Sequence, residues 1–252
     1  MAITFLTSAV LLFSLQHKML IGGYNDKGLW IEDKDMGLVL KGGENVETFN
    51  LKGITGTAIL KKPIKHNVDD GPAPEWGIEL ENHSKSEKSD FAISKGRKIF
   101  PRLPKVLPTK SALYEKVVND WLTQQGLKHA KVNLVKAIRI DLDGDGTEEV
   151  VLSSHPSGDY LRDLSSKKPY CVILVRKLVN GVVTTIAVYS DVAVMGNESV
   201  FYNVEVQGVA DLDGDGNMEI ITSFDYYEGV GHCVFRIEGS KAVKVGCASF
   251  GA

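Results

Sequence analysis

Two short segments of the chain concentrate carboxylates at a spacing that suits a metal ion. Each contains Leu-Asp-Gly-Asp-Gly, and we call them loop 1 (residues 141–149) and loop 2 (residues 211–219). Acidic residues at loop positions 1, 3, 5 and 9 can converge on one cation, and the carbonyl at position 7 would add a further oxygen. The candidate ligands are Asp141, Asp143, Asp145, Thr147 and Glu149 in loop 1 and Asp211, Asp213, Asp215, Asn217 and Glu219 in loop 2.

The charges and glycines of both loops favour a hard divalent cation. Carboxylates about 5 Å apart repel by roughly 3 kcal/mol per pair at an effective dielectric of about 20, so a cation would stabilise each loop. Glycine at positions 4 and 6 permits the positive φ angles that fold the chain back. We expect one Ca2+ ion per loop, because calcium takes about six to eight oxygen ligands, with Mg2+ as the alternative ion. The competing interpretation is a pair of tight turns with solvated aspartates.

The residues around the loops exclude an EF-hand, which would place similar acids at its first positions. The twelfth position of an EF-hand needs a bidentate Glu, whereas Leu152 and Thr222 stand there. Apolar, β-branched residues enter loop 1 over 135–140 and leave it over 150–153, and equivalent segments flank loop 2. The sequence therefore predicts strand, loop and strand at both places.

The pattern Asp-x-Asp-Gly-Asp-Gly-x-x-Glu followed by a β-branched pair resembles the calcium loop of FG-GAP or VCBS repeats, the blades of integrin-type β-propellers. The resemblance implies calcium held by the acids at loop positions 1, 3, 5 and 9. This chain departs from the family in two ways, because Glu149 and Glu219 replace the more frequent Asp and neither loop follows a Phe-Gly or Gly-Ala-Pro signature. The C-terminal half also resembles uncharacterised secreted bacterial proteins with such repeats.

The loops recur 70 residues apart and define two repeat units, 132–195 and 201–252. Each unit is expected to hold four short strands, the last two joined by a hairpin turn at Asn180-Gly181 or near Gly239-Ser240. Four antiparallel strands make a propeller blade, and a ring needs at least about four blades. Two units cannot close a ring, so we expect them to pack on each other or on the N-terminal half.

The predicted fold class is mainly β with a minor α part, in two regions. Residues 1–104 form a β-rich region, and residues 105–252 contain a linker helix and the two calcium-loop repeats. The helix is expected over 111–125, where apolar residues recur at spacings of three and four. This stripe consists of Ala112, Leu113, Val117, Val118, Trp121 and Leu122.

The N-terminal region begins with an uncharged apolar stretch. Residues 1–18 resemble the core of a secretion signal, and a buried strand is the alternative. Turns are predicted at Gly22-Gly23, over 25–28 and at Gly42-Gly43. Calcium loops favour the exterior, because cytosolic calcium is scarce. We therefore expect an extracytoplasmic protein, secreted or in the cell envelope.

Charge and composition narrow the class of partner. The net charge is −3 from 29 basic and 32 acidic residues, and nine of the acids lie in the two loops, which leaves 23 acids against 29 basic residues elsewhere. No stripe of Lys and Arg with interleaved aromatic residues is present, so nucleic acid is not an expected partner. No apolar run reaches the roughly 20 residues of a transmembrane helix, so no transmembrane span is expected.

Three cysteines leave at least one without a disulfide partner. A three-residue turn over 239–241 would place Cys233 directly opposite Cys247, at a separation that suits a disulfide. A two-residue turn would put the two residues out of register. Cys171 is interpreted as a small buried apolar residue.

The sequence favours a non-enzymatic role and leaves enzymatic activity open. It lacks Gly-x-Ser-x-Gly, His-Glu-x-x-His and a phosphate-binding loop. We expect a calcium-binding secreted or cell-envelope protein in which calcium stabilises a repeat domain used for binding or adhesion to a protein or carbohydrate. Tyr226, Tyr227 and Glu228 form the candidate contact surface, because tyrosine is frequent in such surfaces.

Two other functions stay open on the sequence. The first is a secreted hydrolase with catalytic residues in the N-terminal half, among His66, Asp69, Asp70 and Glu75, and an accessory calcium-binding repeat domain. The second is an interaction module of a larger assembly, whose unclosed repeat edges would pair with another chain.

Overall fold

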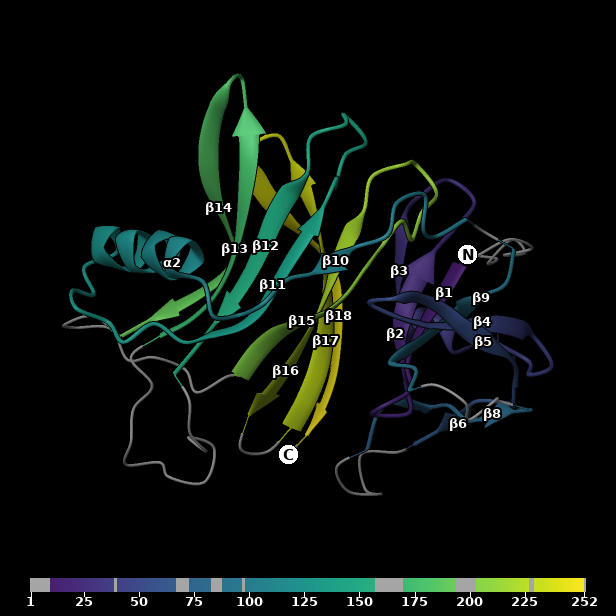
Figure 1. Ribbon diagram of the computed structural model, residues 1–252. Helices are drawn as coiled ribbons and strands as arrows, with labels where there is room; N and C mark the ends of the chain where they lie inside the picture. Colours follow the sequence, from purple (N-terminus) through teal and green to yellow (C-terminus); the bar gives the residue numbers. More distant parts are fainter. Residues whose placement is uncertain are drawn as a thin grey trace.

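The computed structural model describes residues 10–38, 40–66, 73–82, 88–96, 98–156, 170–193, 203–226 and 229–251. In this part of the chain 54% of the residues lie in strands and 8% in helices, which confirms the mainly β fold class. The strands pair antiparallel in three sheets, which we number in chain order (Figure 1).

Sheet 1 contains the N-terminal strands in the order β6-β7-β2-β1-β9-β4-β5-β8, with β3 paired to β2. β1 lies between β2 and β9, and all five of its residues are buried. The later part of the signal-like segment is therefore a buried strand, the alternative that the sequence left open. The elements are β1 (Val10–Ser14), β2 (Met19–Tyr24), β3 (Trp30–Glu32), α1 (Asp33–Met36), β4 (Asn45–Asn50), β5 (Gly53–Leu60), β6 (Ile64–Lys65), β7 (Trp76–Gly77), β8 (Leu80–Glu81) and β9 (Phe91–Ser94).

The turn predicted at Gly22-Gly23 is wrong, because both glycines lie inside β2. A Cβ atom on Gly22 would lie 2.4 Å from the ring of Trp30, and one on Gly23 would lie 2.1 Å from the carbonyl oxygen of Val10. Glycine is needed here because an indole and a neighbouring backbone approach the strand closely. The turn predicted over 25–28 is present.

Sheets 2 and 3 contain the two repeat units. Loop 1 joins β11 to β12 and loop 2 joins β15 to β16, which confirms strand, loop and strand at both places. Sheet 2 consists of β10 (Lys105–Val106), β11 (Leu134–Ile140), β12 (Glu149–Ser154), β13 (Tyr170–Val179) and β14 (Val182–Val192). Sheet 3 consists of β15 (Asn203–Ala210), β16 (Glu219–Tyr226), β17 (Gly229–Glu238) and β18 (Lys241–Gly251).

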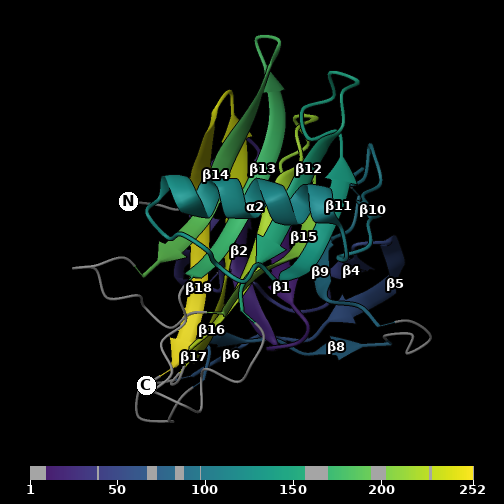
Figure 2. The ribbon, with the colours of Figure 1, turned by 60° about the vertical axis from the view of Figure 1, so that its left-hand side comes forward.

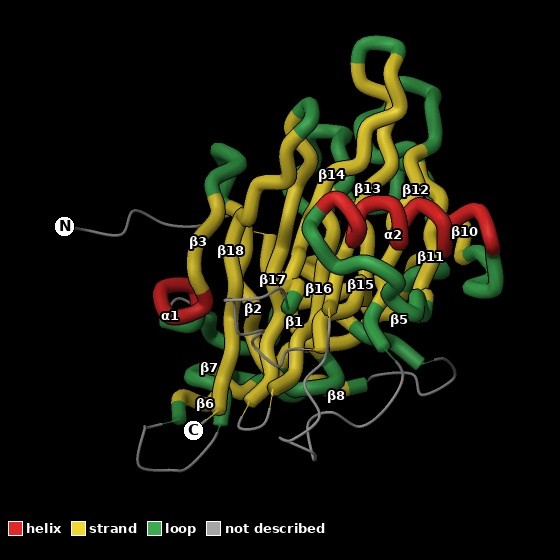
Figure 3. The backbone as a smooth tube through the Cα atoms, turned by 90° about the vertical axis from the view of Figure 1, so that its left-hand side faces the viewer, coloured by secondary structure: helices red, strands yellow, loops and turns green. Residues whose placement is uncertain are grey.

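Helix α2 (Ala112–Gln124) lies across the outer face of sheet 2 (Figures 2 and 3). Its bounds agree with the prediction: the Ser111 hydroxyl oxygen accepts a hydrogen bond from the N–H of Tyr114 at the start, and Gly126 follows the end with φ of 96°. Val118 and Leu122 are buried in the core beneath the helix. Leu113 is 67% exposed, against expectation, because it lies about 140° around the helix from Val118.

Sheet 3 is the middle layer of the molecule and is buried on both faces. On one side Val206 shares a core cluster with Ile173 of sheet 2. On the other side Val234 shares a second cluster with Leu12 of sheet 1. Figure 1 shows the resulting order of layers, from α2 through sheets 2 and 3 to sheet 1. The repeat units thus pack on each other and on the N-terminal half, as expected.

Cys233 and Cys247 form the disulfide that the sequence raised as a hypothesis, with Cα atoms 4.1 Å apart. The route to it differs from the prediction. Glu238 pairs with Lys241, so the turn has two residues, and a β-bulge further along the hairpin restores the register of the cysteines. Cys171 is buried in sheet 2, as expected.

Candidate metal centre

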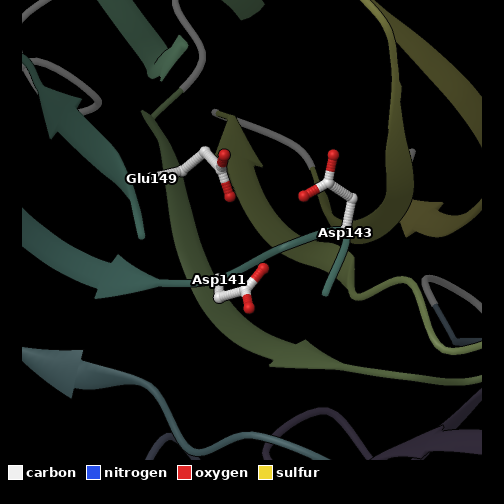
Figure 4. A group of neighbouring side chains, drawn as sticks. All are labelled: Asp141, Asp143 and Glu149. Carbon is white, nitrogen blue, oxygen red and sulfur yellow. The ribbon is translucent and has the colours of Figure 1, made fainter. Parts of the chain in front are cut away.

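Loop 1 brings three of its predicted ligands together. One carboxylate oxygen each of Asp141, Asp143 and Glu149 lies within 4.8 Å of the others. Figure 4 shows these side chains facing one another. Asp141 follows β11 and Glu149 opens β12, so the pairing of these strands fixes the two ends of the loop. Asp145 does not belong to this group and is exposed.

Backbone N–H groups fix the orientation of the carboxylates in loop 1. Asp141 accepts hydrogen bonds from the N–H groups of Gly144 at 2.7 Å and Gly146 at 3.1 Å. Glu149 accepts one from the N–H of Leu142 at 2.7 Å. The two glycines have φ of 74° and 87°, a region that a residue with a Cβ atom rarely adopts.

Loop 2 has the same backbone construction. Asp211 accepts hydrogen bonds from Gly214 at 2.7 Å and Gly216 at 3.1 Å, and Glu219 accepts one from Leu212 at 2.7 Å. The glycines again have positive φ, of 82° and 94°. The repeat predicted from the sequence is thus also a repeat of hydrogen bonds.

The ligand group of loop 2 is composed differently. Carboxylate oxygens of Asp211, Asp213 and Asp215 lie within 4.8 Å of one another, and Glu219 stands outside this group although it is only 1% exposed. Asn217 donates its backbone N–H to Asp215 at 2.6 Å. Both groups offer oxygen atoms only, and such a donor set fits a hard cation such as Ca2+ or Mg2+.

Thr147 and Glu148, at positions 7 and 8 of loop 1, both have interaction partners. The N–H of Thr147 donates to Asp145 at 2.7 Å, as its counterpart does in loop 2. Glu148, the fifth acid of loop 1, forms ion pairs with Lys105 at 2.7 Å and Arg139 at 2.8 Å. Glu148 is therefore engaged on the outside of the loop.

Lys177 of β13 reaches the centre of loop 1. Its ammonium lies 2.7 Å from Oδ2 of Asp143 and 2.9 Å from Oε1 of Glu149, and its side chain is only 7% exposed. Burial alone would lower the pKa of Lys177, but the hydrogen bonds and charges of these two acids raise it overall. For Asp143, burial favours the neutral acid, yet the contact with Lys177 holds its pKa below the ordinary value.

Burial dominates the acids of loop 2. It raises the pKa of Asp211 and of Asp213, against backbone hydrogen bonds that lower them. Burial raises the pKa of Glu219 to about 8, and the neighbouring loop acids add to the shift. A cation bound in loop 2 would oppose these shifts, because it favours the ionised carboxylates.

Arg102 connects the two loops. Its Nε donates to the carbonyl oxygen of Asp141 at 2.6 Å, and one terminal nitrogen donates to the carbonyl oxygen of Gly216 at 2.6 Å. The N–H of Met218 also donates directly to the carbonyl oxygen of Leu142 at 2.7 Å. The candidate sites are thus neighbours, joined by one guanidinium and one backbone hydrogen bond.

The charges of loop 2 act on Tyr24 of sheet 1. Its side chain is 1% exposed, and its hydroxyl makes no hydrogen bond within the part of the chain that the structure describes. Burial raises the pKa of Tyr24, and the charges of Glu219 and Asp213 raise it further. The hydroxyl is therefore a polar group near loop 2 with unused hydrogen-bonding capacity.

Other predicted site residues lie away from the loops or outside the described ranges. Tyr226 is the last residue of β16, whereas Tyr227 and Glu228 fall outside the described residues. Asp69 and Asp70 of the hydrolase alternative also fall outside them. Sequence reasoning missed Lys177, Arg102 and Tyr24, which reach the loops from distant segments. A lysine within the apolar run of β13 was the one local signal.

Comparisons with known proteins identify no family for this chain. Neither helix in the described residues has the length and apolar character needed to cross a membrane. No family model, curated protein or solved structure matches the chain.

Proposed function

We propose that this chain is a non-enzymatic, calcium-stabilised binding protein that works outside the cytoplasm, in the medium or the cell envelope. Calcium acts as a structural ligand of the repeat units, which correspond to two blade-like repeats. The carrying observation is the group of Asp211, Asp213 and Asp215, whose oxygens lie within 4.8 Å of one another on a loop that backbone hydrogen bonds hold in place.

The disulfide supports the extracytoplasmic location. Disulfides persist in oxidising compartments and are rare in the cytosol of most organisms. The bond between Cys233 and Cys247 crosses the hairpin that completes the second repeat unit. It adds to the argument from calcium availability, since weak calcium sites fill readily outside the cell.

We assign binding of a protein or carbohydrate to the segment of Tyr226, Tyr227 and Glu228, because tyrosine is frequent in contact surfaces. A cavity of about 180 Å³, lined by Tyr189, Phe224 and Phe235 among others, lies by sheet 3. Small-molecule sites usually measure roughly 300–1,000 Å³, so this cavity is small for such a ligand.

Thermal unfolding tests the calcium part of the proposal. Protein stripped with a chelator is titrated with Ca2+ and, separately, with Mg2+. At about 100 times the dissociation constant, a bound ion stabilises the fold by about 2.7 kcal/mol, which shows as a rise in Tm. The double variant Asp145→Asn, Asp215→Asn, changed at two exposed acids, should lose most of this rise. No rise with either cation would contradict the proposal.

The binding part needs a separate test. The double variant Tyr226→Ala, Tyr227→Ala is compared with the wild-type chain on a glycan array and against surface proteins of the same cell, with calcium present. Loss of a wild-type signal at unchanged Tm supports the contact surface. An unchanged signal would remove these tyrosines from it.

A further inference from the structure

The contact of Lys177 with loop 1 places a positive charge where a metal ion would act. The ammonium contacts the acids at loop positions 3 and 9, at 2.7 and 2.9 Å. These acids, Asp143 and Glu149, are two of the three members of the ligand group. An ammonium at these distances supplies the charge compensation that converging carboxylates need.

The equivalent lysine position in the second unit is used differently. Arg176 pairs with Val150 and Phe235 pairs with Ile220, so the next residues, Lys177 and Arg236, hold equivalent places beside the final Glu of each loop. The side chain of Arg236 is 42% exposed and forms its ion pair with Glu238 on its own strand. The side chain at this place therefore neutralises loop 1 but not loop 2.

Loop 2 correspondingly keeps polar atoms without partners. Oε2 of Glu219 accepts the hydrogen bond from Leu212, but Oε1 makes no hydrogen bond or ion pair with the residues that the structure describes. The matching oxygen of loop 1 receives Lys177. In sheet 1, the buried hydroxyl of Tyr24, on which the charges of the same acids act, also has no hydrogen-bond partner in the described chain.

We propose that Lys177 is the resident cation of loop 1, and that a divalent cation binds this chain at loop 2 alone. The inference rests on the proposed function, since it assigns the calcium of that proposal to one loop. An ion could enter loop 1 only by displacing a buried ammonium from two acids, which would leave that charge without its partners. In loop 2 the equivalent basic residue, Arg236, pairs with Glu238, and carboxylate oxygens of Asp211, Asp213 and Asp215 lie within 4.8 Å of one another.

Counting bound ions tests the assignment. Titration calorimetry with Ca2+ on the chelator-stripped full chain should give one ion per chain. Asp215→Asn should remove this binding or weaken it by at least tenfold, whereas Asp145→Asn, its counterpart at position 5 of loop 1, should leave it unchanged. Both are exposed acids that accept a hydrogen bond from the residue at position 7, and only Asp215 belongs to a ligand group. These variants need no change at Lys177.

A variant that should gain a second calcium site provides the second test. Lys177→Met removes the charge and keeps a similar length, and it should raise the count to two ions per chain. Should this variant fail to fold, the ion count of the wild-type chain and of the two position-5 variants decides. Two ions on the wild-type chain, or one ion lost through Asp145→Asn, would overturn the assignment while the proposed function stands. No bound ion at all would overturn both.

Discussion

Loop 1 and loop 2 share a sequence motif and a set of backbone hydrogen bonds, yet they differ in what compensates their charge. In loop 1 a buried lysine from the neighbouring strand contacts two acids. In loop 2 the equivalent strand position carries an arginine that pairs elsewhere. The comparison teaches that the motif determines the loop's backbone, whereas residues outside the motif determine how the charge of its acids is compensated.

The pKa directions follow this difference. The Asp143 carboxyl titrates below its ordinary range because Lys177 outweighs burial, whereas burial keeps Asp211 and Glu219 above theirs. The same acidic motif thus contains a carboxyl with a lowered pKa in loop 1 and carboxyls with raised pKa values in loop 2.

Removing the charges of Lys177 and Arg236, which hold equivalent strand positions, should give the largest difference in the free energy of unfolding. Without metal, Lys177→Met should lower the free energy of unfolding by about 3 kcal/mol, because it leaves the buried carboxylate of Glu149 without its partner. Arg236→Met breaks an exposed pair and should cost less than about 1 kcal/mol. Urea unfolding in chelator measures both. Equal losses would erase the distinction between the loops.

The disulfide is a second difference between the two units. Leu174 in sheet 2 holds the strand position that Cys233 holds in sheet 3. Replacing Cys233 and Cys247 by Ala should cost up to about 3 kcal/mol, the value expected for a closed loop of this length. Chemical unfolding with and without reductant checks this prediction. Reduced wild-type protein should match the double variant, and the variant itself should not respond to reductant.

Arg102 tests whether the loops are coupled. Arg102→Ala leaves two loop carbonyls without their donor and should cost about 2 kcal/mol. Arg102→Lys should rescue little, because one ammonium cannot reproduce the planar fork that reaches both carbonyls. Arg139→Ala, at an exposed pair with Glu148, is the control. Calcium affinity that stays the same in Arg102→Ala would show that the loops act independently.

The pH dependence of the metal-free protein should give the smallest effect. Glu219 has an ordinary pKa of 4.5 and a folded pKa of about 8, so its contribution to stability is full below pH 4.5 and is lost as pH rises through 8. His232, with its pKa lowered from 6.5 to about 3 by burial, acts oppositely: its contribution is present above pH 6.5 and lost as pH falls. Between pH 6.5 and 8 the effect of Glu219 on stability is therefore separate from that of His232.

In that window the metal-free stability should fall by at most about 1.4 kcal/mol per pH unit. Thermal melts in chelator measure the slope. Glu219→Gln should flatten it, and saturating calcium should abolish it. A slope that persists in Glu219→Gln would assign the titration to another group.

Local features of the sequence predicted much of the fold. The helix over 111–125, the strands around both loops and the hairpin turn at Asn180-Gly181 depend on short-range patterns, and the structure has all of them. The turn predicted at Gly22-Gly23 is wrong because a pair of glycines is as compatible with a strand beneath an indole ring as with a turn. The ring of Trp30 and the backbone of Val10, both on other strands, decide between the two.

The candidate site was predicted in part for the same reason. The nine-residue spacing identified the acids, since ligand, glycine and turn positions all lie within one segment. Lys177, Arg102 and Tyr24 come from other strands and connections, so spacing alone could not place them. The disulfide shows the converse case, where the pairing was right although a bulge, and not the turn, set the register.

The packing of Trp30 on the backbone of Gly246 in β18 has an optical consequence. The chain has three tryptophans, and each reports on a different contact. Trp30 lies between sheets 1 and 3, Trp76 belongs to the core of sheet 1, and Trp121 lies between α2 and sheet 2. Variants that keep one indole at a time would therefore resolve, by emission wavelength, the order in which the layers separate during unfolding.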